Sequence, residues 1–319
     1  MTRVVIHTAD PAPHVAMLRD RIPAADFAGC DSYAALPALV AAFAPDAVFT
    51  IRFAGSPGFP AAALTGPGGP RWIAVGGSGV DHLGAWDAAR TVVTNAAGLA
   101  ADQMAEFVIG AALHFRLDLP GLAADKAARH WRRDRAMTPL RGGMCLIVGL
   151  GRTGMAVAAR ARAMGMQVVG VRANPAPVPG MAVHGTAALP DLWPAADLIA
   201  VCTPLTTATR GLIGAAALAA MKPDAILVDV SRGGVIDGMA LAAALAAGHL
   251  AGAALDVFEE EPLPQGHPLW SAPRTIICPH ASSVYDAWEG EAVAFFADNL
   301  ARFMAGEPLV NVVDPARGY

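Results

Sequence analysis

The chain has 319 residues and a formal net charge of −4 at pH 7, which is enough length for about two domains with sizeable cores. An acidic balance gives no reason to expect nucleic acid or an anionic membrane as a partner. The N-terminus lacks the apolar core of a signal peptide, and the four cysteines are far apart, so we expect a cytoplasmic protein with buried thiols and without a disulfide or metal site.

Residues 1–95 alternate strand-like and helix-like stretches. The segments RVVIHT, AVFTI, WIAV and TVVTN read as strands, and Ala-rich helical segments separate them. This alternation predicts a small α/β domain. After the third of these strands, residues 76–82 read GGSGVDH. Small residues at a strand end allow consecutive amides to face an anion, although a flexible turn explains this stretch equally well.

A long apolar-periodic helix is predicted over Ala100–Phe115, long enough to link two domains. The basic stretch His130–Arg133, with sequence HWRR, follows it. One short basic run in an acidic protein is typical of a solvated or subunit-contact surface and not of a nucleic-acid site.

The stretch Met144–Gly154, reading MCLIVGLGRTG, combines a short apolar strand with Gly149, Gly151 and Gly154 in a G-x-G-x-x-G pattern. An amphipathic helix ending at Gly165 and a second strand, Gln167–Val171, follow. This β-α-β context predicts a dinucleotide site, because the glycines allow a tight turn, close approach of a pyrophosphate, and close packing of helix on strand. The alternative is a Gly-rich turn in a nucleotide-free α/β domain.

Arg172 stands directly after the second strand, where NAD-binding proteins usually place an acid that bonds the ribose hydroxyls. There is no Asp or Glu between Gly149 and Asp191. An arginine here can pair with the 2′-phosphate of NADP and stack on adenine. We therefore expect NADP(H), with NAD possible; an exposed arginine in an enzyme that uses either coenzyme is the alternative.

Strand-like runs recur beyond the glycine motif (VVGV, LIAV, AILVDV, GAALDV and TIIC), which predicts a parallel, doubly wound sheet. The nearly uncharged segment Gly238–Leu255 reads as a packed helix, a glycine stop and a buried strand, not as a membrane span. A final helix over 289–305 has one apolar face and is expected to pack back on the first domain.

Arg232, Glu261 and His280 each stand just past one of three successive strands. Ligands of open parallel sheets bind beyond the carboxyl ends of the strands, so these side chains are expected to converge. An imidazole can donate a proton to a reduced carbonyl, a carboxylate stabilises the protonated ring, and an arginine can grip a carboxylate with two hydrogen bonds. Taken singly, each has a structural alternative: pairing of Arg232 with Asp229 or Asp237, an exposed loop acid, or a hydrogen-bonded structural histidine.

Six motifs together resemble the D-isomer-specific 2-hydroxyacid dehydrogenases, nearest the glyoxylate/hydroxypyruvate reductases, over almost the whole chain: GSGVDHL at 77–83, VGLGRTG at 148–154, TPLT at 203–206, SRGGVID at 231–237, LDVFEEEPLP at 255–264 and PH at 279–280. The resemblance implies Arg232 as substrate anchor, His280 as acid/base and Glu261 as its partner, since the family's acid immediately precedes a proline. It implies that the amides of Ser78 and Gly79 hold the substrate carboxylate. The implied cofactor contacts are Gly149, Gly151, Arg152, Thr153, Gly154, Arg172, Thr203, Pro204 and Asp256.

The chain departs from the family pattern at two positions: Asp229 stands where asparagine is common, and Ser282 stands where glycine or alanine is common. Neither departure removes a reacting group, but with both present the shape of the pocket does not follow from the resemblance. Arg52, Trp270, Tyr285 and Trp288 could also line it or miss it.

The resemblance implies an α/β fold of two Rossmann-like or flavodoxin-like domains with parallel sheets and an active site in the interdomain cleft. Residues 1–98 and 285–319 would form a discontinuous substrate-binding domain, and residues 99–284 the NAD(P)-binding Rossmann domain. The expected activity is NADP(H)-preferring reduction of glyoxylate or hydroxypyruvate to the D-2-hydroxy acid, in a homodimer. Reduction of larger branched or aromatic 2-oxo acids, or nucleotide sensing without turnover, are the alternatives.

Overall fold

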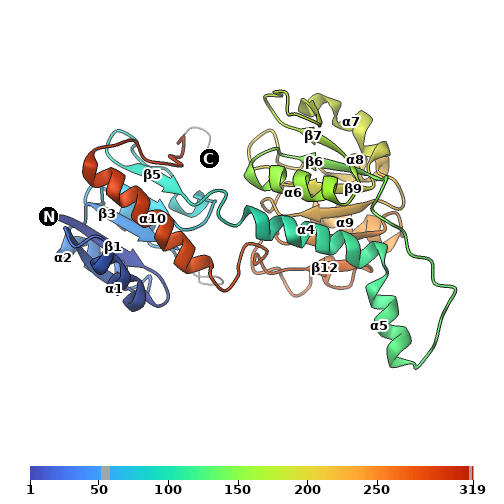
Figure 1. Ribbon diagram of the computed structural model, residues 1–319, viewed down its shortest axis with the longest axis horizontal. Coiled ribbons are helices and arrows are strands. Elements are labelled where there is room, and N and C mark those ends of the chain that lie inside the picture. Colours follow the sequence, from blue (N-terminus) through green and yellow to red (C-terminus); the bar gives the residue numbers. More distant parts are fainter. Residues whose placement is uncertain (52–57, 316–317, 319) are drawn as a thin grey trace. The chain divides into compact units, whose positions relative to one another are not determined.

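The computed structural model describes residues 1–51, 58–315 and 318, and it divides into two compact units (Figure 1). The first comprises Met1–Leu99 with Tyr285–Tyr319, and the second comprises Ala100–Val284. These limits lie within one residue of the domain limits expected from the sequence. The assignment of substrate binding to the first unit stays a prediction.

The first unit contains a five-stranded parallel sheet in the order β2-β1-β3-β4-β5, which is the flavodoxin-like order. Its strands are β1 (Thr2–His7), β2 (Ala25–Cys30), β3 (Ala47–Thr50), β4 (Trp72–Val75) and β5 (Val92–Asn95). The sequence pattern missed β2, whose residues ADFAGC include no β-branched side chain. Pairing of all six residues with β1 outweighs that weak local preference.

The helices of the first unit are α1 (Pro11–Arg21), α2 (Leu36–Phe43), α3 (Ala61–Thr65) and α10 (Trp288–Ala305). The last of these confirms the expected return of the chain to the first sheet. Phe296 is buried against Trp72, with ring centroids 5.0 Å apart and nearly stacked, and against Phe49 at 5.3 Å. Burial of such a ring stabilises the fold by about 1.5–3 kcal/mol.

The second unit contains a seven-stranded sheet in the order β12-β11-β10-β9-β6-β7-β8, and all of its neighbouring strands are parallel. The strands are β6 (Met144–Val148), β7 (Gln167–Val171), β8 (Ala182–His184), β9 (Leu198–Val201), β10 (Ile226–Asp229), β11 (Gly252–Leu255) and β12 (Thr275–Ile277). Six of them occupy the positions of a doubly wound Rossmann sheet, and β12 extends it. The expected parallel, doubly wound architecture is confirmed; only the short edge strand β8 was not foreseen.

The helices of the second unit are α4 (Ala101–Arg116), α5 (Leu119–Ala127), α6 (Arg152–Ala163), α7 (Leu189–Leu192), α8 (Ala215–Ala220) and α9 (Gly238–Ala246). Asp237 caps α9 by accepting hydrogen bonds from the amides of Met239 and Ala240, both over 3.0 Å. Gly248, at φ 68°, then ends the helical segment before β11. This is the helix, glycine stop and buried strand expected for Gly238–Leu255.

In the part of the chain that the structure describes, no single helix has both the length and the apolar character needed to cross a bilayer; α4 and α5 pass that test only jointly, with a 55° bend between them. The helix α5 and residues 128–139, called the arm below, project from the second unit (Figure 1). No residue of α5 is buried, and Trp131 is 88% exposed. Arg135 fastens the segment by bonding Asp118, which directly precedes α5, and Asp125 on α5.

Candidate active site

The predicted site residues of the second unit lie on segments that follow its strands, at one edge of its sheet. Because the strands are parallel, the segments after them emerge at the same side, called the carboxyl edge below. Along the sheet order these segments carry, in turn, His280 after β12, Asp256 after β11, Arg232 after β10, Thr203 after β9 and Gly149 after β6.

Two glycines of the G-x-G-x-x-G motif are required by the protein's own backbone. Gly149 has φ 103°, and a Cβ there would lie 2.7 Å from backbone atoms of Cys202 and Thr203 at the end of β9. A Cβ on Gly154 would collide with the carbonyl oxygen of Gly149. These contacts explain the tight turn and the close packing of α6 on the sheet.

Gly151 has no such internal reason, because no heavy atom lies within 4 Å of the position a Cβ would take. Its backbone is also ordinary for any residue, at φ −79°. The missing side chain leaves open space at the N-terminus of α6, where unpaired amides and the helix dipole favour an anion. The loop therefore fits the pyrophosphate of a dinucleotide.

Five of the other predicted cofactor residues lie at the start of α6 or just after β7 and β9, the two strands that flank β6. Arg152 is exposed at the first position of α6, and the hydroxyl of Thr153 lies 3.8 Å from the sulfur of Met104. Arg172 is half-buried directly after β7, and its amide donates to the carbonyl of His184 over 3.1 Å. Pro204 is exposed beside the half-buried Thr203.

Glu261 and His280 form a hydrogen-bonded pair. Nδ1 of His280 lies 2.9 Å from Oε2 of Glu261, while Oε1 of Glu261 accepts from the amide of Phe258 over 3.0 Å. The two side chains are 26% and 40% exposed, respectively, so the imidazole is both anchored and accessible. With Nδ1 held by a carboxylate, Nε2 is the nitrogen that can donate a proton to a ligand.

The backbone of His280 is fixed as firmly as its ring. Its φ is 54°, in the left-handed region that few non-glycine residues adopt. Its amide donates to the carbonyl oxygen of Asp256 over 2.9 Å. Of the neighbouring acids, Glu259 lies instead 3.6 Å from Arg210, so the choice of Glu261 from the three adjacent glutamates agrees with this geometry.

Arg232 stands on a turn that packs against the loop carrying Glu261. A Cβ on the next residue, Gly233, would collide with the carbonyl group of Phe258. Arg232 Nη1 donates to the carbonyl oxygen of Ser231 over 2.7 Å, and its side chain is half-buried. Of the alternative partners considered, Asp237 caps α9, whereas Asp229 is close enough for the charge of Arg232 to lower its pKa.

Ser78 and Gly79 follow β4 at the carboxyl edge of the first unit's sheet. The loop is tied down, because Asn95 donates from Nδ2 to the carbonyl oxygen of Ser78 over 2.8 Å. Asn311 in turn donates to the carbonyl oxygen of Asn95 over 3.2 Å. The sequence reading missed Asn95, although a polar residue closing the strand TVVTN was a visible signal.

Three aromatic residues considered for the pocket have other contacts. The indole of Trp270 donates to the carbonyl oxygen of Pro264, and Tyr285 donates to Glu291 over 2.5 Å. Trp288 packs on the core of the first unit. Arg52 lies outside the described residues.

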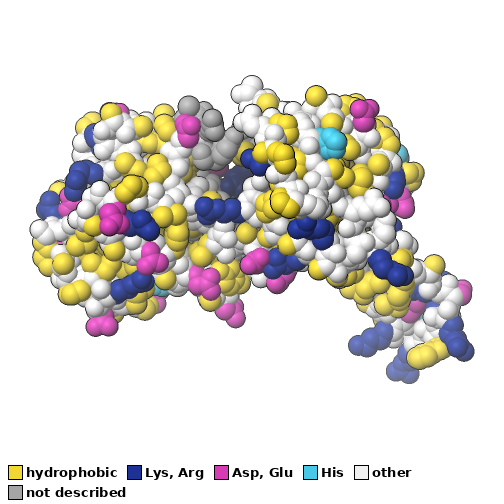
Figure 2. Space-filling model, turned by 45° about the horizontal axis from the view of Figure 1, so that its top comes forward, with side chains coloured by type: hydrophobic (Ala, Val, Ile, Leu, Met, Phe, Trp, Pro, Cys, Tyr) yellow, Lys and Arg dark blue, Asp and Glu magenta, His cyan; other side chains and the backbone are white. Residues whose placement is uncertain are grey.

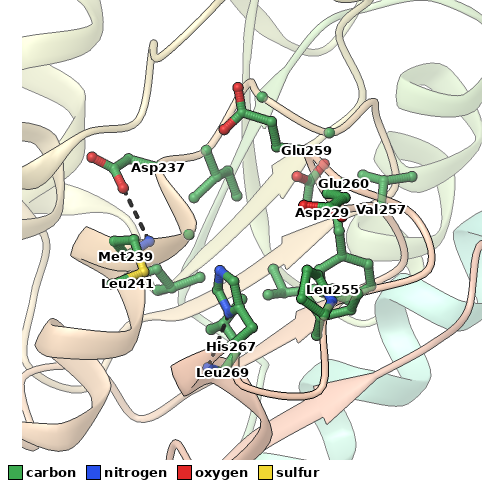
Figure 3. Close-up of a pocket in the computed structure, with 17 residues that line it drawn as sticks. Asp229, Asp237, Met239, Leu241, Leu255, Val257, Glu259, Glu260, His267 and Leu269 are labelled. Atoms are coloured by element: carbon green, nitrogen blue, oxygen red, sulfur yellow. Dashed lines mark hydrogen bonds between the residues drawn. The ribbon is translucent and has the colours of Figure 1, made fainter.

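A cavity of about 280 Å³ is lined by residues that follow Arg232 and that precede and follow Glu261 in the sequence (Figure 3). Its lining includes Asp229, Asp237, Glu259, Glu260 and His267 over an apolar base, and it does not include Arg232, Glu261 or His280. The sequence reading missed this cavity, because its walls come from three loops whose packing no local pattern encodes.

Residues 109–282 match the model of the D-isomer specific 2-hydroxyacid dehydrogenase, NAD binding domain. A D-3-phosphoglycerate dehydrogenase of Methanocaldococcus jannaschii is 35% identical over 75% of this chain, which spans 46% of that relative's length. A glyoxylate reductase of Aeropyrum pernix is 38% identical over 55% of this chain and 52% of its own.

Among solved structures, a D-isomer specific 2-hydroxyacid dehydrogenase from Xanthobacter autotrophicus, in complex with NADPH and MES, superimposes with a TM-score of 0.82. It is 30% identical, and the match covers 100% of this chain and 99% of that one. The family match covers more than half of the 319 residues. It includes the glycine motif and the hydrogen-bonded pair of Glu261 and His280. The chain therefore belongs to the D-isomer-specific 2-hydroxyacid dehydrogenase family.

Proposed function

We propose that this protein is an NADP(H)-preferring reductase of a small 2-oxo acid, with glyoxylate or hydroxypyruvate as the leading substrates. The observation that carries the proposal is the 2.9 Å hydrogen bond between Glu261 and His280 at the same sheet edge as the glycine loop. The nicotinamide, when bound, supplies the hydride for C2 of the substrate. Nε2 of His280 supplies the proton for the carbonyl oxygen, and Glu261 stabilises the charged ring before transfer.

Arg232 and the loop of Ser78 and Gly79 bind the substrate in this proposal. A guanidinium grips a carboxylate with two parallel hydrogen bonds and polarises the adjacent carbonyl. The amides of Ser78 and Gly79 hold the carboxylate from the first unit, where Asn95 fixes their loop. The position of the site in a cleft between the two units stays a prediction.

The preference for NADP(H) is supported by Arg172, which stands half-buried after β7 where no acid is present. A guanidinium there favours a 2′-phosphate. The Xanthobacter relative was crystallised with NADPH, which agrees with this assignment. NAD(H) is the coenzyme to compare.

The decisive experiment is an absorbance assay of the purified chain with glyoxylate, hydroxypyruvate, phenylpyruvate and 2-oxoisovalerate, each with NADPH and with NADH. We expect the highest kcat/KM for one of the two small acids with NADPH. Faster reduction of the branched or aromatic acids would overturn the substrate assignment. Coenzyme binding without reduction of any acid would instead support a nucleotide-sensing protein.

We also infer a homodimer that forms through the arm. The arm exposes Trp131, Leu119, Leu122 and Met137, and basic side chains gather on it (lower right in Figure 2). Exposed apolar groups on a projecting element are typical of an interface, and cyclic dimers are the commonest soluble oligomers. Light scattering should give twice the chain mass, and Trp131→Asp should shift it toward the monomer; a monomeric parent protein would contradict the inference.

A further inference from the structure

Two buried carboxyl groups lie at the carboxyl ends of neighbouring strands in the second unit. Asp229 ends β10 and Asp256 directly follows β11, and each is 2% exposed. The amide of Asp256 donates to the carbonyl oxygen of Asp229 over 2.9 Å. Burial of two acids side by side is costly unless hydrogen bonds or nearby charge compensate.

Asp229 is bonded to the serine that precedes the substrate anchor. Oδ1 of Asp229 accepts from the amide of Ser231 over 2.9 Å and from its hydroxyl over 2.5 Å. The carbonyl oxygen of the same serine accepts from Arg232 over 2.7 Å. Asp229 therefore fixes the turn from which Arg232 extends.

Asp256 is bonded to the segment that follows the histidine. Oδ1 of Asp256 accepts from the amides of Ala281 and Ser282 over 2.8 and 2.9 Å, and Oδ2 accepts from the Ser282 hydroxyl over 2.5 Å. The carbonyl oxygen of Asp256 also accepts from the amide of His280. Arg232 and His280 are thus each positioned by a buried, hydrogen-bonded Asp–Ser pair: Asp229 with Ser231, and Asp256 with Ser282.

Asp229 and Ser282, the two residues named above as departures from the pattern that the chain resembles, belong to these two pairs. They lie on either side of Asp256, which faces Asp229 and accepts from Ser282. The Ser282 hydroxyl donates to Asp256, and the charge of Asp256 acts on Asp229. The two departures are therefore physically coupled.

We propose that Asp229 and Ser282 are positioning residues, and that ionisation of Asp229 weakens the hold of Arg232 on the substrate carboxylate. The proposal rests on the function proposed above. A negative charge on Asp229 attracts the guanidinium of Arg232 and repels an anionic ligand, whereas the neutral carboxyl group exerts neither effect.

The electrostatic surroundings place this ionisation in the neutral range. Burial, helped by the charge of Asp256, raises the pKa of Asp229 to about 7, against the opposing effects of the hydrogen bonds from Ser231 and the charge of Arg232. Cys202, which directly follows β9, is neutral because burial raises the pKa of its thiol. The cavity of Figure 3 adds these titratable side chains to the surroundings of Asp229: Asp237, Glu259, Glu260 and His267.

The first test measures kcat and KM for glyoxylate with NADPH from about pH 5.5 to pH 9 in the parent protein and in Asp229→Asn. If the ionised form binds substrate poorly, KM of the parent rises about tenfold between about pH 6 and pH 8, since the competent fraction falls by that factor. The rise should disappear in Asp229→Asn, because the amide keeps the acceptor for Ser231 without titrating. An unchanged rise in that variant would overturn the proposal.

Two further variants keep the test sharp. Ser231→Ala removes a bond that favours the charged form, so the step in KM should move to higher pH; a step that stays in place contradicts the assignment to Asp229. Asp237→Asn, on the same cavity but engaged in capping α9, is the matched control and should keep the parent's pH profile.

The last measurement does not depend on turnover, and it distinguishes failure of this inference from failure of the proposed function. Because Asp229 binds its proton more tightly in the folded than in the unfolded chain, the fold loses stability as pH rises toward 7. The melting temperature of Asp229→Asn, relative to the parent, should therefore increase from about pH 5 to pH 8. Ser282→Ala should change this increment in a double-mutant cycle; a pH-independent increment, or strict additivity, would overturn the coupling even in an inactive protein.

Discussion

Nδ1 of His280 and Oε2 of Glu261 lie 2.9 Å apart, although the two residues are separated by 19 positions in the sequence. The pair forms because β11 and β12 are adjacent parallel strands and the loops after them leave the same edge. The second oxygen of Glu261 is held by the amide of Phe258. Both the orientation and the charge of the carboxylate therefore act on the imidazole.

Glu261→Gln should lower kcat by roughly 10²-fold or more, because a neutral amide neither stabilises the protonated ring nor selects one tautomer. The neighbouring Glu259→Gln and Glu260→Gln are matched controls that should stay close to the parent. Steady-state kinetics with saturating NADPH measure the effect. Equal losses in all three variants would show that general loop charge, and not this pair, is responsible.

His280→Ala should reduce kcat by roughly 10²–10⁴-fold, the contribution of a positioned acid, while NADPH still binds. Coenzyme fluorescence titration and single-turnover reduction separate the two effects. His14→Ala, which removes an ion pair with Glu289 in the first unit, serves as control. Near-normal turnover in His280→Ala would exclude this residue as the proton donor.

Arg232→Lys should raise KM and lower kcat together, because an ammonium cannot reproduce the two-pronged grip on a carboxylate. Arg210→Lys, at an exposed ion pair with Glu259, is the control and should have little effect. Kinetics and thermal melting should be measured on both variants. A change in melting temperature alone would assign Arg232 a structural role.

The sequence predicted most of this architecture because its strands are apolar runs that pair in parallel and lie between helices. The exceptions have physical reasons: β2 forms by pairing its small residues with β1, which no local pattern encodes. The glycine motif could be read because Gly149 and Gly154 are needed by the backbone itself. Gly151 is required neither by a positive φ nor by a close backbone contact. Its role could therefore be predicted only by considering the pyrophosphate that the loop would bind.

Asp229 shows where sequence reading ends. It was visible as an acid inside AILVDV, but its burial beside Asp256 depends on the register of β10 and β11. Its bonds to Ser231 depend on the turn that follows. The same holds for Ser282, whose partner Asp256 lies 26 residues earlier. Long-range partners of buried polar groups require the assembled sheet.

The stability of the first unit should depend on the protonation of His7. This side chain is fully buried, its Nδ1 lies 2.7 Å from the hydroxyl oxygen of Thr50, and burial lowers its pKa to about 4, against a smaller opposing effect of Asp31. Between about pH 4 and pH 6.5 the unfolded chain binds the proton that the folded chain rejects, so stability rises with pH. The loss at the acid end is on the order of 3 kcal/mol.

His7→Gln retains a polar partner for Thr50 without titrating, and its melting temperature should fall less steeply than the parent's as pH drops from about 6.5 to 4.5. His14→Gln is the histidine control in the same unit. Parallel curves for the parent and His7→Gln would show that His7 does not contribute to acid destabilisation.

Coenzyme choice provides the sharpest test of the second unit. Arg172 directly follows β7, and its amide is fixed by the carbonyl oxygen of His184, so its side chain starts from a defined position. A carboxylate there repels a 2′-phosphate and bonds the ribose hydroxyls instead. Arg172→Asp should therefore strongly lower kcat/KM with NADPH, while kcat/KM with NADH changes little or improves.

Arg162→Asp is the charge-matched control, because Arg162 lies in the same unit but is bonded to the carbonyl oxygen of Pro179. This variant should keep the parent's ratio of kcat/KM with NADPH to kcat/KM with NADH. Equal efficiency of the parent with both coenzymes would contradict the role of Arg172 before any variant is made.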